Sequence, residues 1–405
     1  MKTFEILKRD PSTKARLGKL YTAHGVVDTP VFAPVGTQGA VKTLISEDLE
    51  KLGTQLILGN TYHLYLRPGV DVIEKAGGLH AFMSWRGAIL TDSGGYQVFS
   101  LEQLRRISEE GVEFRSHIDG SLHFLSPEKA MEIQIALGSD IAMCFDECPP
   151  YPCTEDRARQ ALEMTTRWAR RCQETFSKAP SPLAGEGGRR PDEVTPHPNP
   201  LPQGEREQRL LYGITQGAIY PALRRESTMQ LIDLDFPGYA LGGLSLGEPR
   251  SATLEMIQLS TELLPDNKPR YLMGVGTPED LWEAVELGID QFDCVLPTRN
   301  GRNGQLFTSQ GKLNMKNAPF REDFSPPDPA CDCELCARYS RAYLHHLFRA
   351  GELGALRLAS LHNVAFLIKL MRKIRQSIAD GTFVKDKKDF LSAYRNEGSA
   401  VQEGC

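Results

Sequence analysis

The sequence predicts an α/β protein, a (β/α)₈ TIM barrel with an N-terminal antiparallel cap and an inserted C-terminal helical subdomain. Two observations carry this prediction. Short apolar runs alternate with segments of helical spacing between residues 31 and 305, and eight such runs can be counted. Continuous apolar runs separated by helical segments are typical of buried parallel strands joined by crossovers. A doubly wound open sheet is the alternative fold. It is disfavoured because no G-x-G-x-x-G motif follows the first strand.

Bulk composition narrows the class of protein. At 405 residues, with 40% apolar and 24% charged residues, the chain can bury one large core. It has no run of 18 apolar residues and no apolar block at its start, so we expect a soluble, cytoplasmic protein. The net charge of −5 means that a nucleic acid would need a local basic patch. Nine cysteines without a secretion signal favour metal binding over disulfides.

Residues 1–30 read as short alternating stretches separated by polar breaks, which predict antiparallel hairpins that form an N-terminal β cap. The barrel is expected over 31–305. Its eight predicted strands are 31–35, 55–60, 88–92, 140–146, 211–216, 239–244, 271–276 and 291–295. Two intervening helices begin with a cap residue followed by proline, at Ser126 and Thr277, and Ser46 is a third possible cap.

The remaining segments are assigned by composition. Residues 178–207 are rich in proline and glycine and poor in apolar residues, so we expect a disordered surface insertion with no role in the chemistry. Residues 306–395 are expected to form the helical C-terminal subdomain, and 396–405 a tail. In that subdomain Tyr339, Tyr343 and His346 share one helical face, the aromatic face, for which core packing is the default interpretation.

A metal site is indicated by Cys331, Cys333 and Cys336, spaced C-x-C-x₂-C, and by His362 on a predicted helix. Three thiolates and one imidazole form the tetrahedral set that Zn²⁺ prefers and leave no coordination position open, which predicts one structural zinc ion. The adjacent histidines His345 and His346 compete with His362 as fourth ligand, but a ligand from a distant segment cross-links the subdomain better. The alternative is reduced cysteines without a metal.

Three aspartates, Asp92, Asp146 and Asp293, stand at the ends of predicted strands, where the functional residues of a barrel converge. A turn former or helix cap is the alternative for each one. One carboxylate can attack carbon while a second moves a proton, which suits cleavage at a glycosidic carbon. A carbohydrate hydrolase and a nucleoside-type transferase both remain open. The segment after Asp293 is expected to be a glycine-containing loop with two arginines, Arg299 and Arg302, suited to phosphate contacts.

Six motifs in this chain together resemble the bacterial queuine tRNA-ribosyltransferase family, the tRNA-guanine transglycosylases. They appear in the family's order and span nearly the whole chain apart from the proline-rich insertion. The motifs are Asp92-Ser-Gly-Gly-Tyr-Gln97, Phe145-Asp-Glu-Cys148, Gly213-Ile-Thr-Gln-Gly217, Leu241-Gly-Gly-Leu-Ser-Leu-Gly-Glu248, Phe292-Asp-Cys-Val-Leu-Pro-Thr-Arg-Asn-Gly-Arg302, and the three cysteines with His362.

The resemblance implies a zinc-containing pentosyltransferase. It would exchange guanine at wobble position 34 of tRNAs with a GUN anticodon (those for Tyr, His, Asn and Asp) for 7-aminomethyl-7-deazaguanine (preQ1), the precursor of queuosine. By matching motifs, Asp293 would attack C1′ of the ribose and hold the tRNA covalently, and Asp92 would be the proton acceptor. Asp146 would bind the pyrimidine edge of the base, and Gln216 and the Gly243 amide its carbonyl oxygen.

The same resemblance implies further contacts to the two substrates. The Leu244 carbonyl would face the aminomethyl group, Tyr96 would stack on the base, and Cys148 would lie beside the base pocket. Arg299 and Arg302 would contact the tRNA around the exchanged base.

Two positions bear on the branch of the family. Leu246 stands where the eukaryotic enzymes carry glycine, which favours the small precursor over queuine, and Ser245 replaces the alanine usual in bacterial members. The family is homodimeric through the zinc subdomain and the loop near Phe82, which makes the aromatic face a candidate interface. Queuine as incoming base, a retaining glycoside hydrolase with a structural zinc, and a non-catalytic RNA-binding barrel are the alternatives.

Overall fold

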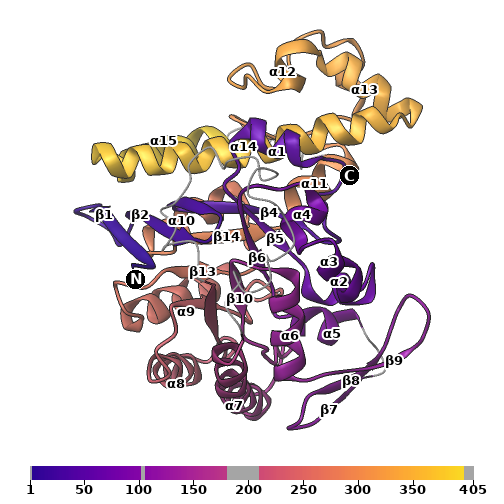
Figure 1. The fold of residues 1–405 in the computed structure, drawn as a ribbon. Helices are drawn as coiled ribbons and strands as arrows, with labels where there is room; N and C mark the ends of the chain where they lie inside the picture. The colour runs from indigo at the N-terminus through magenta and orange to yellow at the C-terminus, as the bar shows by residue number, and fades with distance from the viewer. Residues whose placement is uncertain (1, 102–104, 180–208, 396–405) are drawn as a thin grey trace, which may run out of the picture.

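The computed structural model describes residues 2–101, 105–179 and 209–395, arranged as in Figure 1. Parallel strands close into a barrel in the order β10-β11-β12-β13-β14-β4-β5-β6. The eight strands are β4 (Val31–Gly36), β5 (Leu56–Gly59), β6 (Ala88–Thr91), β10 (Ile141–Met143), β11 (Leu210–Thr215), β12 (Gly238–Leu241), β13 (Arg270–Leu272) and β14 (Gln291–Cys294). Each lies on one of the eight predicted runs, so the predicted barrel is confirmed and the open sheet is wrong.

The barrel interior is a packed apolar core. Alternate residues of a strand point to opposite faces, and those that point inward here are aliphatic or aromatic. Leu56 and Leu58 of β5, Ala88 and Leu90 of β6, and Tyr212 of β11 belong to this interior cluster. The interior is therefore filled, and polar chemistry is confined to the ends of the strands.

An antiparallel sheet of β1 (Phe4–Arg9), β2 (Arg16–Thr22) and β3 (Gly25–Thr29) covers one end of the barrel. Phe4 and Leu20, on the side of this sheet that faces the barrel, pack into the interior cluster. The buried Arg16 guanidinium donates to both carboxylate oxygens of Asp290, at 2.9 and 2.5 Å, next to the start of β14. The predicted hairpins and cap are thus confirmed, and the cap lies at the N-terminal ends of the strands, opposite the aspartates.

Helices surround the barrel strands. They are α1 (Ser46–Leu52), α2 (Thr61–Leu66), α3 (Val70–Lys75), α4 (Leu79–Met83), α5 (Gly95–Leu101), α6 (Pro127–Leu137), α7 (Glu155–Ser177), α8 (Pro221–Ile232), α9 (Arg250–Leu263) and α10 (Pro278–Glu286). The side chains of Ser126 and Thr277 accept from backbone amides of the first turn, as predicted. The Ser46 cap is wrong, because Ile45 is the N-cap and the Ser46 hydroxyl donates to the Met83 carbonyl.

A small antiparallel sheet between β6 and β10 was not predicted from the sequence. It consists of β7 (Arg105–Ile107), β8 (Val112–Arg115) and β9 (Leu122–Leu125), and it projects from the barrel (Figure 1). Its strands have three or four residues, too few for alternation to be visible in the sequence. The predicted proline-rich insertion lies outside the described residues except for 178 and 179, which follow α7, and the predicted tail lies outside them entirely.

The segment after Asp293 is a helix, α11 (Leu296–Asn303), so the predicted basic loop is wrong. It is followed by the hairpin β15 (Gln305–Thr308) and β16 (Gly311–Asn314), then by a 3-10 helix (Ala318–Glu322), α12 (Glu334–Arg338) and α13 (Arg341–Ala350). The chain then forms α14 (Leu353–Asp380) and α15 (Phe383–Arg395).

The long helix α14 returns to the barrel. It packs against α11 and also contacts α1, α10 and β4, so it occupies the place of the eighth barrel helix, and the cysteine segment is inserted between β14 and this helix. Length and composition alone would let α14 cross a membrane, but 72% of its apolar window is buried, as in the core helix of a folded protein. The boundary predicted at residues 305 and 306 stays a prediction.

Candidate functional site

Three buried carboxyl groups lie together at the C-terminal end of the barrel. Asp92 follows β6, Asp146 follows β10, and Asp293 lies within β14, with exposed fractions of 7%, 4% and 9%. Their proximity affects ionisation: burial raises the pKa of Asp92 to about 7, and the charges of Asp293 and Asp146 contribute to that increase. The mouth of the barrel thus contains carboxyl groups that can exchange protons near neutral pH.

The Asp92 carboxylate is held on both oxygens. The Thr61 amide donates to Oδ1 at 2.8 Å, and the side-chain amides of Asn60 and Gln97 donate to Oδ2 at 2.5 and 3.0 Å. The Asn60 side chain also caps α2 by accepting from the His63 amide. These donors come from the chain after β5 and from α5, so two neighbouring barrel connections fix the orientation of Asp92.

Asp146 and Gln216 form a second polar unit. The Ser93 hydroxyl donates to Asp146 Oδ1 and the Gln216 side-chain amide to Oδ2, both at 2.7 Å. Burial raises the pKa of Asp146 to about 6, although both hydrogen bonds favour the carboxylate. A Cβ atom on Gly95 would lie 2.5 Å from the Asp146 carbonyl oxygen, so glycine is required at that position.

Asp293 is oriented by its strand neighbour β13 and the chain that follows it. The Tyr271 hydroxyl donates to Oδ1 at 2.5 Å, and the Gly274 amide donates to the same oxygen at 2.8 Å. Burial raises the pKa of Asp293, and these two hydrogen bonds act against the increase. Both donors go to Oδ1, so neither of these hydrogen bonds occupies Oδ2.

The loop after β12 approaches Gln216 closely. Gly243 has a φ of 65°, and a Cβ atom there would lie 2.4 Å from Gln216 Oε1, an oxygen that is buried and has no hydrogen-bond partner among the described residues. Leu244 is buried. The Glu248 carboxylate accepts from the amides of Ser245 and Leu246, which fixes the loop.

Two further candidate residues differ in exposure. Tyr96 lies on α5 and is 48% exposed, so the ring is accessible and is not a core aromatic. Cys148 is buried beside the Asp146 segment, and burial raises the pKa of its thiol, which therefore stays protonated at neutral pH.

The two arginines lie on α11. Arg299 is exposed, whereas Arg302 is half-buried and its Nε donates to the Thr298 carbonyl at 3.1 Å. The helix is anchored where Gly301 meets α14, because a Cβ atom on this glycine would lie 2.7 Å from the Ser360 amide nitrogen. Arg299 lies in the first half of this helix, which begins three residues after Asp293.

The four predicted metal ligands come together. The Sγ atoms of Cys331, Cys333 and Cys336 and a ring nitrogen of His362 lie within 4.8 Å of one another. His362 Nδ1 is 3.3 Å from the Sγ atoms of Cys333 and Cys336, while its Nε2 is 2.7 Å from the Phe307 carbonyl and donates to it. This second hydrogen bond leaves Nδ1 as the free donor atom for a metal, so the residues fit a tetrahedral ion such as Zn²⁺.

The competing histidines are excluded as ligands. His345 Nδ1 is 2.8 Å from the Met315 carbonyl, and His346 is exposed. A second possible group, His24, His80 and Asp140, lies near the N-terminal cap. There the two stacked rings and the backbone amides of His24 and Ile89 surround the Asp140 carboxylate as hydrogen-bond donors, which accounts for the arrangement.

Several residues of the site were not singled out from the sequence. Asn60 ends a predicted strand, so the positional rule that selected the aspartates could have found it. Ser93 and Gln97 lie inside the first motif. Tyr271 had no signal, because its role depends on a contact with a neighbouring strand.

Comparison with known proteins agrees with this geometry. A sequence profile described as queuine tRNA-ribosyltransferase matches residues 10–396. A queuine tRNA-ribosyltransferase of Caldanaerobacter subterraneus subsp. tengcongensis is 55% identical over 391 residues, 96% of this chain and 97% of its own. One of Pelotomaculum thermopropionicum is 53% identical over 395 residues, 98% of this chain and 99% of its own. The chain therefore belongs to the queuine tRNA-ribosyltransferase family.

Proposed function

We propose that this enzyme exchanges guanine at the wobble position of GUN-anticodon tRNAs for preQ1 through a covalent ribosyl-aspartate intermediate. The observation that carries the proposal is the pair Asp293 and Asp92 in one buried barrel mouth, where Asp92 has a pKa of about 7. Family membership supports a tRNA-guanine pentosyltransferase and disfavours the glycoside hydrolase and the non-catalytic barrel.

Asp293 is the nucleophile in this proposal. Tyr271 and Gly274 both bind Oδ1, so Oδ2 is available to attack C1′. As the new C–O bond forms, the glycosidic C–N bond breaks and its electron pair goes to the ring nitrogen of guanine. A water-poor site around these atoms strengthens their electrostatic interactions.

Asp92 moves the proton. In its protonated form it protonates the ring nitrogen of departing guanine, and as a carboxylate it accepts the proton of the incoming base, whose nitrogen then attacks C1′ and displaces Asp293. A pKa near the working pH serves both directions of transfer. Asn60 and Gln97 hold the carboxyl group in place during both steps.

The base is bound opposite Asp92. The Asp146 carboxylate accepts from the N–H groups of the pyrimidine edge, and the Gln216 amide and the Gly243 N–H donate to the ring carbonyl. The Leu244 carbonyl faces the aminomethyl group, the exposed Tyr96 ring stacks on the base, and the neutral Cys148 thiol lines the pocket. Leu246 fills space that the larger base queuine needs, which favours preQ1 as the incoming base.

The tRNA is held next to the nucleophile by α11. Arg299 and Arg302 lie on this helix, and they supply a local positive charge on a chain with a net charge of −5. Phosphate contacts of this kind make affinity depend on salt, so tRNA affinity should fall steeply as ionic strength rises.

One structural Zn²⁺ per subunit is assigned to Cys331, Cys333, Cys336 and His362. The ion cross-links the cysteine segment to α14 and takes no part in the exchange reaction. We place the enzyme in the cytoplasm.

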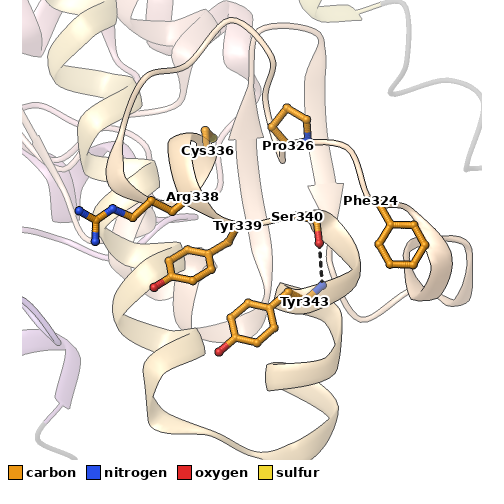
Figure 2. Close-up of a pocket in the computed structure, with 7 residues that line it drawn as sticks. All are labelled: Phe324, Pro326, Cys336, Arg338, Tyr339, Ser340 and Tyr343. Atoms are coloured by element: carbon orange, nitrogen blue, oxygen red, sulfur yellow. Dashed lines mark hydrogen bonds between the residues drawn. The ribbon is translucent and has the colours of Figure 1, made fainter.

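The enzyme is proposed to be a homodimer that uses the aromatic face. The predicted single helical face is wrong, because Tyr339 lies between α12 and α13 whereas Tyr343 and His346 lie on α13. Core packing is wrong for Tyr343, which is 44% exposed, and for the exposed His346, whereas Tyr339 is half-buried against the core. Phe324, which lines the same surface hollow as the two tyrosines, is 80% exposed. Figure 2 shows the rings of Tyr339 and Tyr343 side by side, with centroids 5.2 Å apart, along a surface hollow of about 560 Å³. Exposed aromatic groups of this size are typical of protein interfaces.

The test of the proposed function is base exchange. Purified, zinc-loaded enzyme should incorporate radiolabelled guanine into unmodified tRNA for Tyr or Asp, and absence of incorporation would reject the proposal. Competition by preQ1 and queuine identifies the preferred incoming base, with preQ1 expected to compete at lower concentration.

Trapping tests the intermediate. Asp293→Asn should abolish the tRNA adduct seen on a denaturing gel, while Asp290→Asn, at a carboxylate bound to Arg16 at the other end of the same strand, should retain it if the variant folds. An adduct that persists in Asp293→Asn would place the nucleophile elsewhere, and Asp92 would then be the next candidate nucleophile.

A further inference from the structure

Arg224 is a buried cation whose side-chain hydrogen bonds, among the described residues, all go to uncharged oxygen atoms. It lies on α8, its side chain has no exposed surface, and it forms no ion pair with the described residues. Its Nη1 donates to the carbonyls of Thr215 at 3.1 Å and Gly242 at 2.9 Å, and its Nη2 donates to the Ala218 carbonyl at 2.8 Å. Burial of a guanidinium is costly, so its retention calls for an explanation.

The guanidinium remains charged at neutral pH. Burial lowers the pKa of Arg224 to about 10, still well above the pH of a cell. Its three acceptors are the last residue of β11, Thr215, and two residues in the segments that follow β11 and β12, the same segments that carry Gln216 and Gly243. The cation therefore lies directly behind the part of the pocket assigned to the base carbonyl.

One of these hydrogen bonds ends on a peptide group of the pocket itself. The Gly242 carbonyl and the Gly243 N–H are the two ends of a single peptide unit. A charged donor on the carbonyl end withdraws electron density from that unit and makes its N–H a stronger donor, because hydrogen bonds in series polarise one another. A Cβ atom on Gly243 would lie 3.9 Å from Arg224 Nη2, so the two groups are close neighbours.

We propose that Arg224 is a positioning residue that acts through the Gly242–Gly243 peptide on the carbonyl oxygen of the bound purine. It strengthens the hydrogen bond from Gly243 and stabilises the negative charge that spreads to this oxygen as guanine leaves C1′. The inference rests on the proposed function, in which the Gly243 N–H binds that oxygen. It adds a source of specificity for 6-oxopurines and of stabilisation for the leaving base.

The competing explanation is a purely structural role, in which Arg224 only ties the two loops together. The two roles differ in which ligand they affect. Loop disorder would weaken binding of every purine, whereas the polarised peptide acts only on a purine that has an oxygen at C6. 2-Aminopurine lacks that oxygen, and it can be compared with guanine in the same proteins.

The experiment measures the Kd of radiolabelled guanine by equilibrium dialysis and that of 2-aminopurine by competition, with pure zinc-loaded protein. Arg224→Met removes the charge at similar volume, Arg224→Lys keeps it, and Arg225→Met alters the exposed neighbour on the same helix. We expect Arg224→Met to raise the Kd of guanine about tenfold and that of 2-aminopurine less than about twofold. Arg224→Lys should recover part of the guanine affinity, and Arg225→Met should match the wild type.

2-Aminopurine also lacks the ring N–H that guanine donates to Asp146, and this difference cancels because it is the same in every protein compared. Equal weakening of both ligands in Arg224→Met, or no recovery in a folded Arg224→Lys, would overturn the inference in favour of the structural role. An unchanged Kd of guanine in Arg224→Met would also overturn it. Failure of the wild type to exchange guanine would instead reject the proposed function, so the two failures are distinguishable.

Discussion

In the proposed mechanism, Asp146 couples recognition of the base to pH. Its pKa of about 6 is raised by burial, so below pH 6 the free enzyme holds a protonated carboxyl group that must lose its proton to accept from two base N–H groups. The Kd of guanine should therefore be flat above about pH 7 and rise roughly tenfold per pH unit below the pKa.

Equilibrium dialysis between pH 4.5 and 8 checks this dependence. Asp146→Asn should bind guanine weakly with no inflection near pH 6, whereas Asp92→Asn should keep the inflection. If Asp146→Asn retained it, another group would be responsible.

Tyr271 offers a second prediction for a single residue. Its hydroxyl donates to Asp293 Oδ1, a hydrogen bond that orients the carboxylate and favours its ionised form. Tyr271→Phe removes one of two such donors, so kcat for guanine exchange should fall by about ten- to a hundredfold with little change in the KM for the base. Retention of the wild-type kcat would show that the Gly274 amide suffices, and thermal unfolding controls for loss of fold.

Among the elements, α11 depends on close packing against α14. A methyl group at Gly301 would lie 2.7 Å from the Ser360 amide nitrogen, and backbone atoms cannot move away cheaply. Gly301→Ala should therefore destabilise the protein by about 1–3 kcal/mol and raise the KM for tRNA, because Arg299 and Arg302 move with the helix.

Gly354→Ala is the matched control for Gly301→Ala. It lies in the first turn of α14, where a Cβ atom meets nothing within 4 Å. This substitution should be neutral or slightly stabilising in denaturant unfolding. Equal effects of both alanines would contradict the packing argument.

At the scale of the whole molecule, the metal site and the barrel share α14. His362 lies on this helix, which also contacts α1, α10 and β4. Chelation of the metal should therefore lower the melting temperature of the entire protein, because the ligand helix is also the eighth helix of the barrel. Calorimetry before and after chelation measures the change, and added Zn²⁺ should reverse it. A separate, local transition would indicate that the two parts unfold independently.

The last prediction concerns the oligomeric state of the enzyme. In the proposed homodimer, Tyr343→Ala removes an exposed ring from the aromatic face, so it should shift sedimentation from dimer towards monomer with little effect on thermal stability of the subunit. Tyr239→Phe, at a buried ring of β12, serves as a control that should leave the sedimentation unchanged. A Tyr343→Ala protein that stays fully dimeric would place the interface elsewhere.

Much of this architecture follows from local patterns in the chain. Apolar runs marked all eight barrel strands, and their ends marked Asp92, Asp146 and Asp293. The short β7–β9 sheet was missed because three or four residues carry little periodicity. The loop expected after Asp293 is α11, where Pro297 lies in the first turn, a position that suits proline, and contact with α14 outweighs the low helix propensity of Gly301.

The sequence by itself determined the barrel, the strand-end carboxylates and the Cys₃His ligand set, because these depend on periodicity and on residue types at fixed spacings. Only the tertiary structure decided that burial raises the pKa values of Asp92 and Asp146 towards neutrality, that Tyr343 is exposed, and that Arg224 is buried against the segment that carries Gly243. The physical reason is that burial and charge proximity arise from segments distant in the chain. Asp92, for example, owes its pKa to burial at a mouth shared with Asp293, about half the chain length away.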